Sequence, residues 1–303
     1  MSFDITFLGC GSASPTSFRN PTSQLVQVQD RTFLIDCGEG TQVALRKNKI
    51  RMQKIQAIFI SHLHGDHYFG LPGLLSTFHL LGREKELSIY ASAHLLPILQ
   101  ALFKASNTYL SYRLNFVPLN FKSPTLLFQD KRLEVHSFPL KHSIESCGFL
   151  IKEKIKARKI NRKAVDAYEI PVFELNKIKD GADFLRDDGL LIKNERLTFD
   201  PDASLSYAYC SDTMYHPAVC EFIEGVDLLY HEATFANDCK ALAKKTKHST
   251  AEQAALIAKK AAVKQLIIGH YSARYTDLNV LLNEAKSVFE NCLLADDGLK
   301  IQL

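Results

Sequence analysis

Short apolar segments of strand length alternate with segments of helical spacing along most of the chain. The clearest strand is Ile55–Ile60, whose nearly all-apolar sequence is typical of a strand covered on both faces. Further strands are expected at Ile5–Leu8, Leu25–Val28, Thr32–Ile35, Leu87–Ala91, Leu126–Phe128, Leu133–Phe138, Cys147–Ile151, Leu205–Cys210, Val226–Tyr230 and Gln265–Gly269. Helices are expected at Leu71–Leu81, His94–Ala105, Thr250–Lys260 and Leu278–Phe289, and a last pair of short strands ends the chain. Because strands and helices mix in both halves, we predict an α+β fold with two mixed sheets between helices, a four-layer αβ/βα sandwich.

The pattern weakens in one stretch between the two halves. Lys152–Lys163 contains seven basic residues and one acidic residue among twelve, and weakly patterned sequence continues to about Thr198. We interpret residues 153–198 as an arm inserted into a single domain that spans residues 1–303. From the residues alone, the basic run is either a solvated charged face or a surface that binds phosphate groups.

Composition narrows the class of protein only modestly. The 303 residues are 46% apolar and 23% charged, and the net charge of +4 is too small to indicate a nucleic-acid partner by itself. The seven cysteines contain no C-x-x-C spacing, which argues against a secreted disulfide framework. No apolar run reaches the roughly 18 residues of a membrane span, and the N-terminus lacks the basic region of a signal peptide. We therefore expect a cytoplasmic protein without a membrane partner.

The candidate chemistry follows directly after the clearest strand. Four potential metal ligands lie within six residues of the run Ser61-His62-Leu63-His64-Gly65-Asp66-His67. Imidazole and carboxylate groups suit zinc and similar divalent ions. Residues two apart in extended backbone face the same way, so His62 and His64 are predicted to bind one ion. Asp66 and His67 then face a second ion beyond a sharp turn that Gly65 allows.

Two pairs of ligands cannot complete two coordination spheres, so other ligands must come from elsewhere. Three candidates follow other expected strands: His142, Asp212 and His270. Strand ends at one edge of a sandwich converge, so one pocket can collect all of these side chains. Asp212 taken alone could equally be a helix N-cap before Pro217. The combined set predicts a two-metal hydrolase.

These motifs closely resemble those of the metallo-β-lactamase superfamily and, within it, of the ribonuclease Z family. The resemblance covers nearly the whole chain, through Phe33–Gln42, Ser61–His67, His142, Ser211–Thr213 and His270. The run His-x-His-x-Asp-His alone specifies only the superfamily. The stretches that indicate ribonuclease Z are Gly70–Leu75, His231–Thr234 and His248–Thr250.

The resemblance implies a metallo-β-lactamase-like fold and a dinuclear metal site. The implied ligands are His62, His64 and His142 for the first zinc ion, Asp66, His67 and His270 for the second, and Asp212 as a bridge. Asp36 corresponds to the residue that orients the ligands. Two Zn²⁺ per subunit are expected, and because Mn²⁺ can support similar sites, the physiological metal stays open.

The resemblance also implies catalytic roles. A metal-bridged hydroxide attacks the phosphodiester, Asp66 accepts the proton of that water, and His248, oriented by Glu232, protonates the leaving 3′-oxygen. The spacing Ser249-x-x-Glu252 predicts a capping box, which places His248 just before a helix N-terminus whose dipole disfavours imidazolium. A carboxylate partner is therefore physically required. From the residues alone, we would instead expect Glu232 only to cap a helix or to pair on the surface.

The implied activity is a zinc-dependent endoribonuclease. It removes the 3′ trailer from precursor tRNA and leaves a 3′-hydroxyl on the tRNA and a 5′-phosphate on the trailer. In the family's homodimer, the arm of one subunit grips the tRNA bound at the other's site, and residues 153–198 occupy the place of that arm. Bacterial members usually have a Gly-Pro turn in the arm, where this chain has Ile170–Leu175, and the loop Pro15–Asn20 has Ser17 in place of a lysine. The arm's RNA contacts and the response to CCA-bearing tRNA therefore stay open.

Two other classes of function also stay open. A small-molecule phosphodiesterase could use the same site, although the basic arm argues against it. A catalytically silent RNA-binding protein is the other alternative, and the full set of ligands argues against it.

Overall fold

The computed structural model describes residues 2–303, which divide into two units. The larger unit comprises residues 2–128, 135–151 and 206–303, and the smaller unit comprises residues 129–134 and 152–205. Among the described residues, no helix is both long and apolar enough to cross a lipid bilayer.

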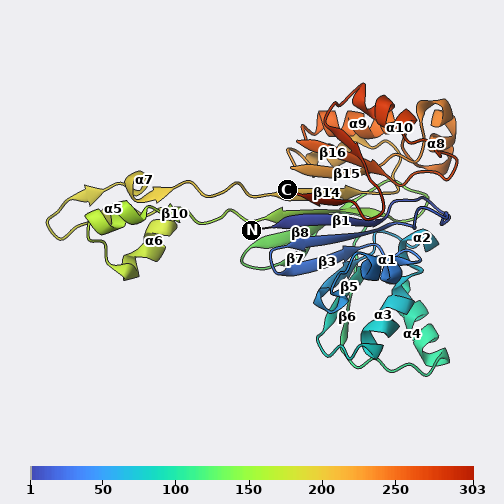
Figure 1. The fold of residues 1–303 in the computed structure, drawn as a ribbon, viewed down its shortest axis with the longest axis horizontal. Helices are drawn as coiled ribbons and strands as arrows, with labels where there is room; N and C mark the ends of the chain where they lie inside the picture. The colour runs from blue at the N-terminus through green and yellow to red at the C-terminus, as the bar shows by residue number, and fades with distance from the viewer. Residues whose placement is uncertain (1) are drawn as a thin grey trace. The chain divides into compact units, whose positions relative to one another are not determined.

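Two seven-stranded sheets form the centre of the larger unit, as far as the described residues show (Figure 1). In spatial order the first sheet contains β18 (Lys300–Gln302), β1 (Phe3–Gly9), β2 (Ser23–Val28), β3 (Arg31–Ile35), β4 (Ala57–Phe59), β5 (Leu87–Ala91) and β6 (Leu114–Pro118). The second sheet contains β17 (Cys292–Leu294), β16 (Gln265–Gly269), β15 (Leu228–Glu232), β14 (Ser206–Cys210), β9 (Cys147–Glu153), β8 (Leu133–Pro139) and β7 (Thr125–Gln129).

Each sheet contains a section of parallel strands. Strands β3 to β6 run parallel, and β1 pairs antiparallel with both β18 and β2. In the second sheet β14 to β17 run parallel. Parallel strands are buried on both faces, which is why β4, β14 and β15 are fully buried and nearly continuous in apolar and aromatic residues.

The two sheets pack face to face through aromatic side chains. The rings of Phe59 on β4 and Phe149 on β9 lie 5.4 Å apart between centroids, and those of Phe7 on β1 and Tyr230 on β15 lie 5.8 Å apart. Tilted contacts at this spacing are favourable for aromatic pairs. This interior layer fixes the relative position of the strand ends that carry the candidate site.

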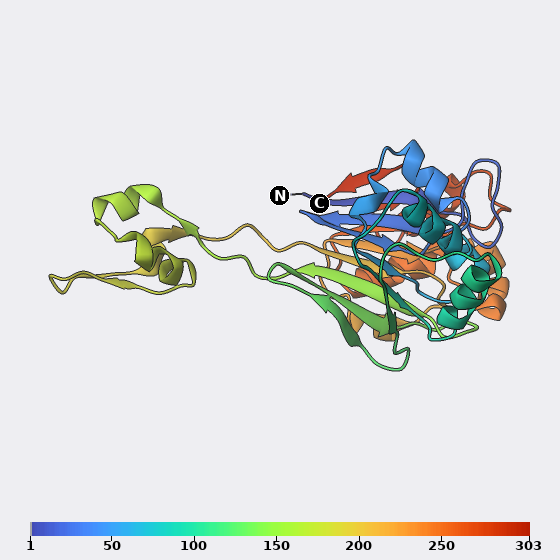
Figure 2. The ribbon, with the colours of Figure 1, turned by 90° about the horizontal axis from the view of Figure 1, so that it is seen from below.

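Helices cover the outer faces of both sheets. They are α1 (Thr41–Lys47), α2 (Gly65–Tyr68), α3 (Leu71–Leu80), α4 (Leu95–Ala105), α8 (Lys240–Thr246), α9 (Ala251–Lys260) and α10 (Asn279–Lys286). In Figure 2, α3 and α4 cross in front of the strands of the first sheet. A buried cluster that includes Leu74 and Phe78 of α3 and Ile58 of β4 joins these two layers. The predicted αβ/βα sandwich is therefore confirmed.

Several predicted elements differ in detail. The strand expected at Ile55–Ile60 is shorter, because Met52–Lys54 form a 3₁₀ turn (η1) and pairing begins at Ala57. The last two strands do not pair with each other: β17 joins the second sheet and β18 the first. Their short sequences carry no signal for the choice of partner, which depends on tertiary contacts.

The smaller unit has a core of its own. Its elements are β10 (Lys159–Ile160), α5 (Arg162–Ala167), η2 (Val172–Glu174), α6 (Leu175–Lys179), β11 (Phe184–Leu185), β12 (Leu191–Ile192), α7 (Asn194–Leu197) and β13 (Thr198–Phe199). Val165, Ile178 and Leu197 belong to its buried cluster. Ion pairs join Lys156 to Glu153, Arg158 to Asp200 and Lys159 to Asp202. Part of the positive charge of the basic run is thus neutralised within this unit.

Candidate active site

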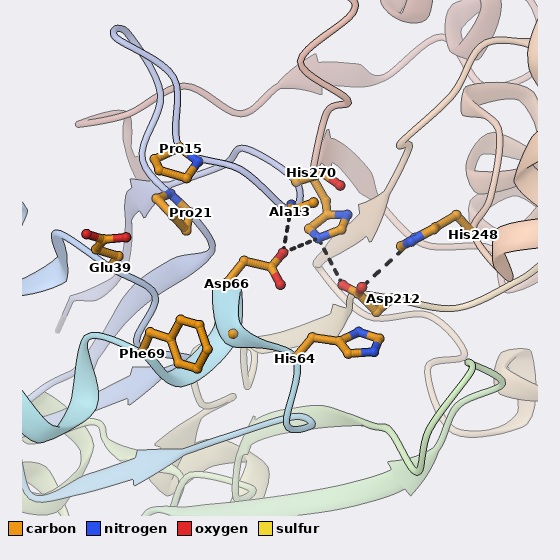
Figure 3. Close-up of a pocket in the computed structure, with 12 residues that line it drawn as sticks. Ala13, Pro15, Pro21, Glu39, His64, Asp66, Phe69, Asp212, His248 and His270 are labelled. Carbon is orange, nitrogen blue, oxygen red and sulfur yellow. Dashed lines mark hydrogen bonds and ion pairs between the residues drawn. The ribbon is translucent and has the colours of Figure 1, made fainter.

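The predicted site residues come together at one edge of the larger unit, where strands of both sheets end. Figure 3 shows His64, Asp66, Asp212, His248 and His270 around one pocket. The loop after β4 carries His62 and His64, and α2 carries Asp66 and His67. Of the remaining candidate ligands, His142 follows β8, Asp212 follows β14 and His270 follows β16. The carboxyl ends of the parallel strands β14 and β16 point to the same edge of the sheet, which explains why Asp212 and His270, distant in sequence, meet here.

The side chains form two adjoining groups. One group contains His62, His64, His142 and Asp212, and the other contains Asp66, His67 and His270; within each, the potential ligand atoms lie within 4.8 Å of one another. The two carboxylate oxygens of Asp212 face different groups. Oδ1 lies 3.0 Å from Nε2 of His67 and 3.1 Å from Nε2 of His270. Oδ2 lies 3.6 Å from Nε2 of His62 and 3.5 Å from Nε2 of His142.

These residues fit divalent ions on two further observations. Nε2 of His67 and of His270 are buried and, among the described residues, make no hydrogen bond. Burial raises the pKa of Asp66 and Asp212, but the neighbouring imidazoles lower it more, so both pKa values lie well below their usual range. Ionised carboxylates beside free imidazole nitrogens are a donor set that zinc and similar ions accept.

Asp36 fixes the orientation of His67, a member of the group that also contains Asp66 and His270. Its carboxylate Oδ2 accepts hydrogen bonds from the Ser61 hydroxyl (2.8 Å) and the Tyr209 hydroxyl (2.6 Å) and lies 2.8 Å from Nδ1 of His67. The backbone N–H of Ser61 donates to Oδ1 at 2.7 Å. An imidazole that donates from Nδ1 to a carboxylate keeps Nε2 free as a ligand, which is the arrangement typical of metal-binding histidines.

Three of these residues have a left-handed backbone. The φ angles of Asp36, Asp212 and His270 are 56°, 50° and 60°. This conformation is unfavourable for residues with a β-carbon and is concentrated at functional sites. Here each residue follows a strand end, and the reversal of the chain turns its side chain into the site.

Gly65 was expected to allow a sharp turn through its conformational freedom, but the structure gives a different reason for glycine at this position. Gly65 does not have a positive φ; it begins α2. A β-carbon at this position would lie 2.2 Å from the ring of Phe69. The ring of Phe69 packs over the backbone here, so any larger residue at position 65 would displace this exposed ring.

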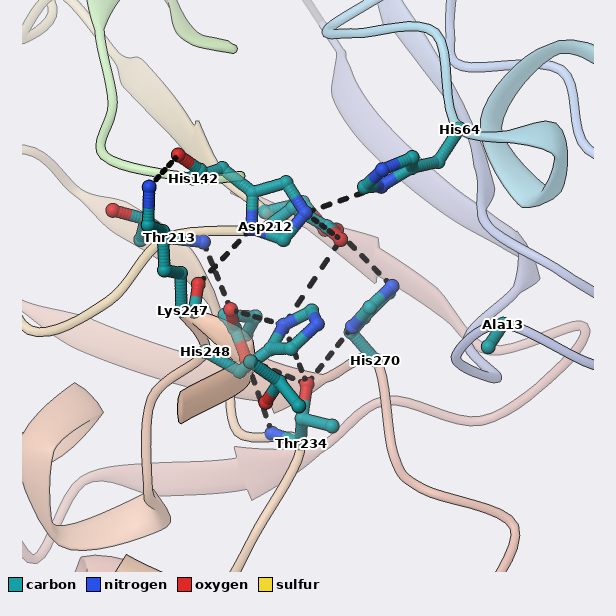
Figure 4. A network of polar contacts seen from close by, with 12 residues as sticks. Ala13, His64, His142, Asp212, Thr213, Thr234, Lys247, His248 and His270 are labelled. Carbon is teal, nitrogen blue, oxygen red and sulfur yellow. Dashed lines mark hydrogen bonds and ion pairs between the residues drawn. The ribbon is translucent and has the colours of Figure 1, made fainter. Parts of the chain in front are cut away.

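His248 and Glu232 form a second carboxylate–imidazole pair. Figure 4 shows His248 close to Asp212, Thr234 and His270. Nδ1 of His248 lies 2.8 Å from Oε1 of Glu232, which is fully buried. Glu232 also accepts hydrogen bonds from the backbone N–H of Thr213 (2.8 Å) and the hydroxyl of Thr234 (2.6 Å). Burial opposes protonation of His248, but the Glu232 carboxylate outweighs it and raises the pKa of His248 to about 9. A surface role for Glu232 is therefore excluded by its burial.

The capping box lies one residue later than predicted. Thr250, not Ser249, caps α9, and its partner is Gln253, not Glu252. Ser249 instead donates its hydroxyl hydrogen to the Thr213 carbonyl (2.7 Å), and Glu252 accepts a hydrogen bond from Asn237. Both spacings satisfy the same sequence pattern, so only the fold selects between them. His248 still lies within one turn of the helix N-terminus.

Sequence analysis missed several supporting groups. Thr234 contacts Nδ1 of His270 (2.9 Å) as well as Glu232, and the Lys247 carbonyl lies 3.0 Å from Nδ1 of His142. The backbone N–H of Ala13 donates to Oδ2 of Asp66 at 2.8 Å. Thr234 lies within a motif that was already singled out, so its position was a usable signal. The Lys247 carbonyl and the Ala13 amide carry no sequence signal, because any residue supplies these groups.

The site opens into a pocket of about 530 Å³. Its lining includes His64, Asp66, Asp212, His248 and His270, and Figure 3 shows Phe69 and Pro15 at its rim. Each ligand group thus presents members to this pocket, and His248 lines the same pocket.

The fold and the site define the chain as a metallo-β-lactamase-fold hydrolase. The metallo-β-lactamase fold protein YhfI from Bacillus subtilis has a TM-score of 0.72 at 20% identity and covers 100% of both chains, which is a likeness of fold alone.

Close relatives then give the family. Ribonuclease Z from Bacteroides thetaiotaomicron is 48% identical over 99% of this chain and 95% of the relative, and that from Porphyromonas gingivalis is 43% identical over 99% of each. The structure of human tRNase Z, short form, has a TM-score of 0.70 at 27% identity and 98% coverage of both chains. The chain belongs to the ribonuclease Z family, a family of phosphodiester-cleaving endoribonucleases, which confirms the resemblance read from the motifs.

A family model matches part of the chain as well. Residues 3–158 match the model described as Anti-Pycsar protein Apyc1, so the chain also belongs to the family that this model describes. The matched half includes the run His62–His67 and His142, whereas Asp212, His248 and His270 lie beyond it.

Proposed function

We propose that this protein is a zinc-dependent endoribonuclease that removes the 3′ trailer from precursor tRNA. The products are a tRNA with a 3′-hydroxyl and a trailer with a 5′-phosphate. One observation carries the proposal: a buried carboxylate holds a protonated histidine, His248, at the wall of the pocket that also exposes both ligand groups. The family relationship supports the choice of RNA as substrate.

We assign the metal ligands as two sets that share one residue. His62, His64 and His142 would hold one ion, and Asp66, His67 and His270 would hold the other. Asp212, with one oxygen toward each set, would bridge them. Bound divalent ions supply Lewis acidity, which lowers the pKa of water and neutralises charge on the phosphoryl oxygens. Two Zn²⁺ per subunit is the proposed stoichiometry, with Mn²⁺ as an alternative ion.

Asp66 is the proposed proton acceptor. Its Oδ2 is held by the Ala13 amide and lies 3.5 Å from Nε2 of both His67 and His270. Its Oδ1 makes no hydrogen bond to any described residue, so this oxygen remains available to a water molecule in the pocket. His248 is the proposed proton donor to the leaving 3′-oxygen, since Glu232 keeps it charged at neutral pH.

The smaller unit is the proposed tRNA-binding arm of a homodimer, and the cytoplasm is the proposed location. Residues 153–198 lie within this unit. In place of the family's Gly-Pro turn, Pro171 precedes the turn η2, whose Val172 and Phe173 are exposed. A phosphate-binding role rests on the basic residues outside the ion pairs, such as Lys163.

Cleavage of defined precursors tests the function. The purified protein, with Zn²⁺ or Mn²⁺, is incubated with CCA-less and CCA-containing precursor tRNA, and both product ends are mapped. We expect a single cut that leaves a 3′-hydroxyl on the tRNA. Cleavage of bis(p-nitrophenyl) phosphate without cleavage of either precursor would support a small-molecule phosphodiesterase instead. Protein purified without bound metal, inactive after metal is added, would support a silent RNA-binding role.

A further inference from the structure

A second basic segment lies in the larger unit, apart from the arm. Residues 46–54 contain five basic side chains, and no acidic residue occurs between Glu39 and Asp66. The five are Arg46, Lys47, Lys49, Arg51 and Lys54, all exposed. Among the described residues, none of them has a carboxylate within ion-pair distance. Their positive charge is therefore available to a partner.

Three of these side chains line a hollow against the first sheet. The hollow has a volume of about 410 Å³ and is lined by Lys49, Arg51, Lys54 and Lys300, with Thr32 and other polar residues of β1 to β3 at its base. Lys300 shares its charge with Asp4, 3.4 Å away, whereas the other three do not. Cationic and hydroxyl groups around one hollow form a site for phosphate oxygens.

A second hollow adjoins this one and is lined by the loop that also borders the active-site pocket. It has a volume of about 350 Å³ and shares Asn48 and Gly298 with the first. The second hollow is lined by Phe18 and Arg19, which belong to the same loop as Pro15 at the rim of the active-site pocket. The acidic Asp297 also lines it, but its carboxylate accepts hydrogen bonds from the Cys10 and Asn20 amides.

An exposed aromatic ring accompanies the positive charge along this path. Phe18 is 55% exposed, and the guanidinium of Arg19 lies 5.0 Å from its ring centroid. A basic groove combined with exposed aromatic side chains is the usual arrangement for single-stranded nucleic acid, because phosphates follow the charge and bases stack on the rings.

We propose that these two hollows form a track for the sugar–phosphate backbone of the single strand 3′ of the cut, that is, the trailer of the precursor. Lys49, Arg51 and Lys54 contact its phosphates, and Phe18 stacks on a base near the pocket. The assignment to a trailer rests on the proposed function, whereas the binding of single-stranded RNA does not.

The test removes the three unpaired charges and varies the trailer. The variant carries Lys49→Gln, Arg51→Gln and Lys54→Gln; the control carries Lys259→Gln, Lys260→Gln and Lys286→Gln, which remove equal charge from exposed ends of α9 and α10. KM and kcat are measured on precursors with a single-nucleotide trailer and with a long unstructured trailer. For the long trailer we expect KM to rise about tenfold and the log–log salt slope to fall by about 2, since each lost single-strand phosphate contact removes about 0.7.

The outcomes separate this proposal from the proposed function. The track is supported if the triple variant raises KM for the precursor with the long trailer and leaves KM for the precursor with the single-nucleotide trailer unchanged. Equal rises on both trailers would place the contact on the tRNA body and overturn it, as would a variant that behaves like the control. If the wild-type protein cleaves no precursor, the proposed function fails. Fluorescence anisotropy with an unstructured oligoribonucleotide then decides: weaker binding by the triple variant supports an RNA track, and unchanged binding overturns it.

Discussion

Two carboxylate–imidazole pairs lie within this site, and they have nearly the same internal geometry. In each pair Nδ1 of the histidine is 2.8 Å from a fully buried carboxylate oxygen, Asp36 for His67 and Glu232 for His248. They differ in the surroundings of the other ring nitrogen. Nε2 of His67 faces Asp212 in the interior, whereas the His248 side chain is 14% exposed and lines the pocket.

The difference shows that a buried carboxylate does not by itself define a role for its histidine. Where Nε2 meets other ligand groups, the pair fixes a tautomer with a free lone pair, as a metal ligand requires. Where the ring reaches the pocket, the same partner stabilises the imidazolium, as a proton donor requires. Substitutions in the two pairs should therefore affect metal content and protonation separately.

The largest effect is expected for His67→Ala. This change removes a ligand, so the protein should lose bound metal and at least about 10³-fold in turnover, since removing one group that stabilises transition-state charge already costs up to this much. Metal content by inductively coupled plasma mass spectrometry and cleavage of precursor tRNA check it. Full metal occupancy in the variant would contradict the assignment of His67.

His248→Ala should lower turnover by about 10²- to 10⁴-fold, the range for loss of a general acid, while metal content stays at the wild-type level. His94→Ala is a matched control, because His94 is exposed and lies outside the site. Unchanged turnover would exclude His248 as proton donor. Loss of metal would show that His248, like His67, supports metal binding, and would contradict the contrast between the two pairs.

Asp36→Asn keeps the shape of the side chain but removes its charge. We expect metal affinity to fall by about 10- to 100-fold, because Asp36 orients His67 and increases its basicity. Activity should return when excess metal is added. Competition with a chelator measures the affinity; an activity loss that metal does not restore would contradict an orienting role.

Glu232→Gln should mainly change the pH dependence. The pKa of His248 is about 9, so the protonated form is present at neutral pH and is lost as pH rises through 9. Without the carboxylate, the pKa should fall toward the ordinary value of about 6.5, which lowers turnover about tenfold at pH 7.5. The pH profile of kcat measures this shift. A basic limb that does not move would show that Glu232 does not control His248, and Glu252→Gln serves as the control.

Much of the site was predictable, because its ligands lie at strand ends that the apolar pattern marks. His142, Asp212 and His270 follow β8, β14 and β16, and the parallel strands β14 and β16 bring the last two together. The contact of Tyr209 with Asp36 was not predictable, since it requires the packing of one sheet on the other. The contact of the Lys247 carbonyl with His142 was not predictable either, because a backbone carbonyl carries no sequence signal. The fold class was predictable because the apolar pattern also marks the strands and helices themselves. The placement of β17 in one sheet and β18 in the other was not predictable.

The sequence also did not predict which basic side chains are free of ion pairs. The run Lys152–Lys163 attracts attention by its density, yet Arg158 and Lys159 are paired with Asp200 and Asp202, some forty residues away. The less dense segment at 46–54 has no such partners among the described residues. Sequence patterns count charges, whereas the fold decides which of them are neutralised.

The left-handed backbone at Asp36, Asp212 and His270 implies a trade-off between stability and activity. A left-handed conformation costs about 1–2 kcal/mol for most residues with a β-carbon, less for aspartate and histidine, and glycine avoids most of that cost. If folding alone determined the sequence, these three positions would favour glycine. The metal-free protein thus has a lower free energy of unfolding than its architecture allows, and ligand binding is the term that compensates at these positions.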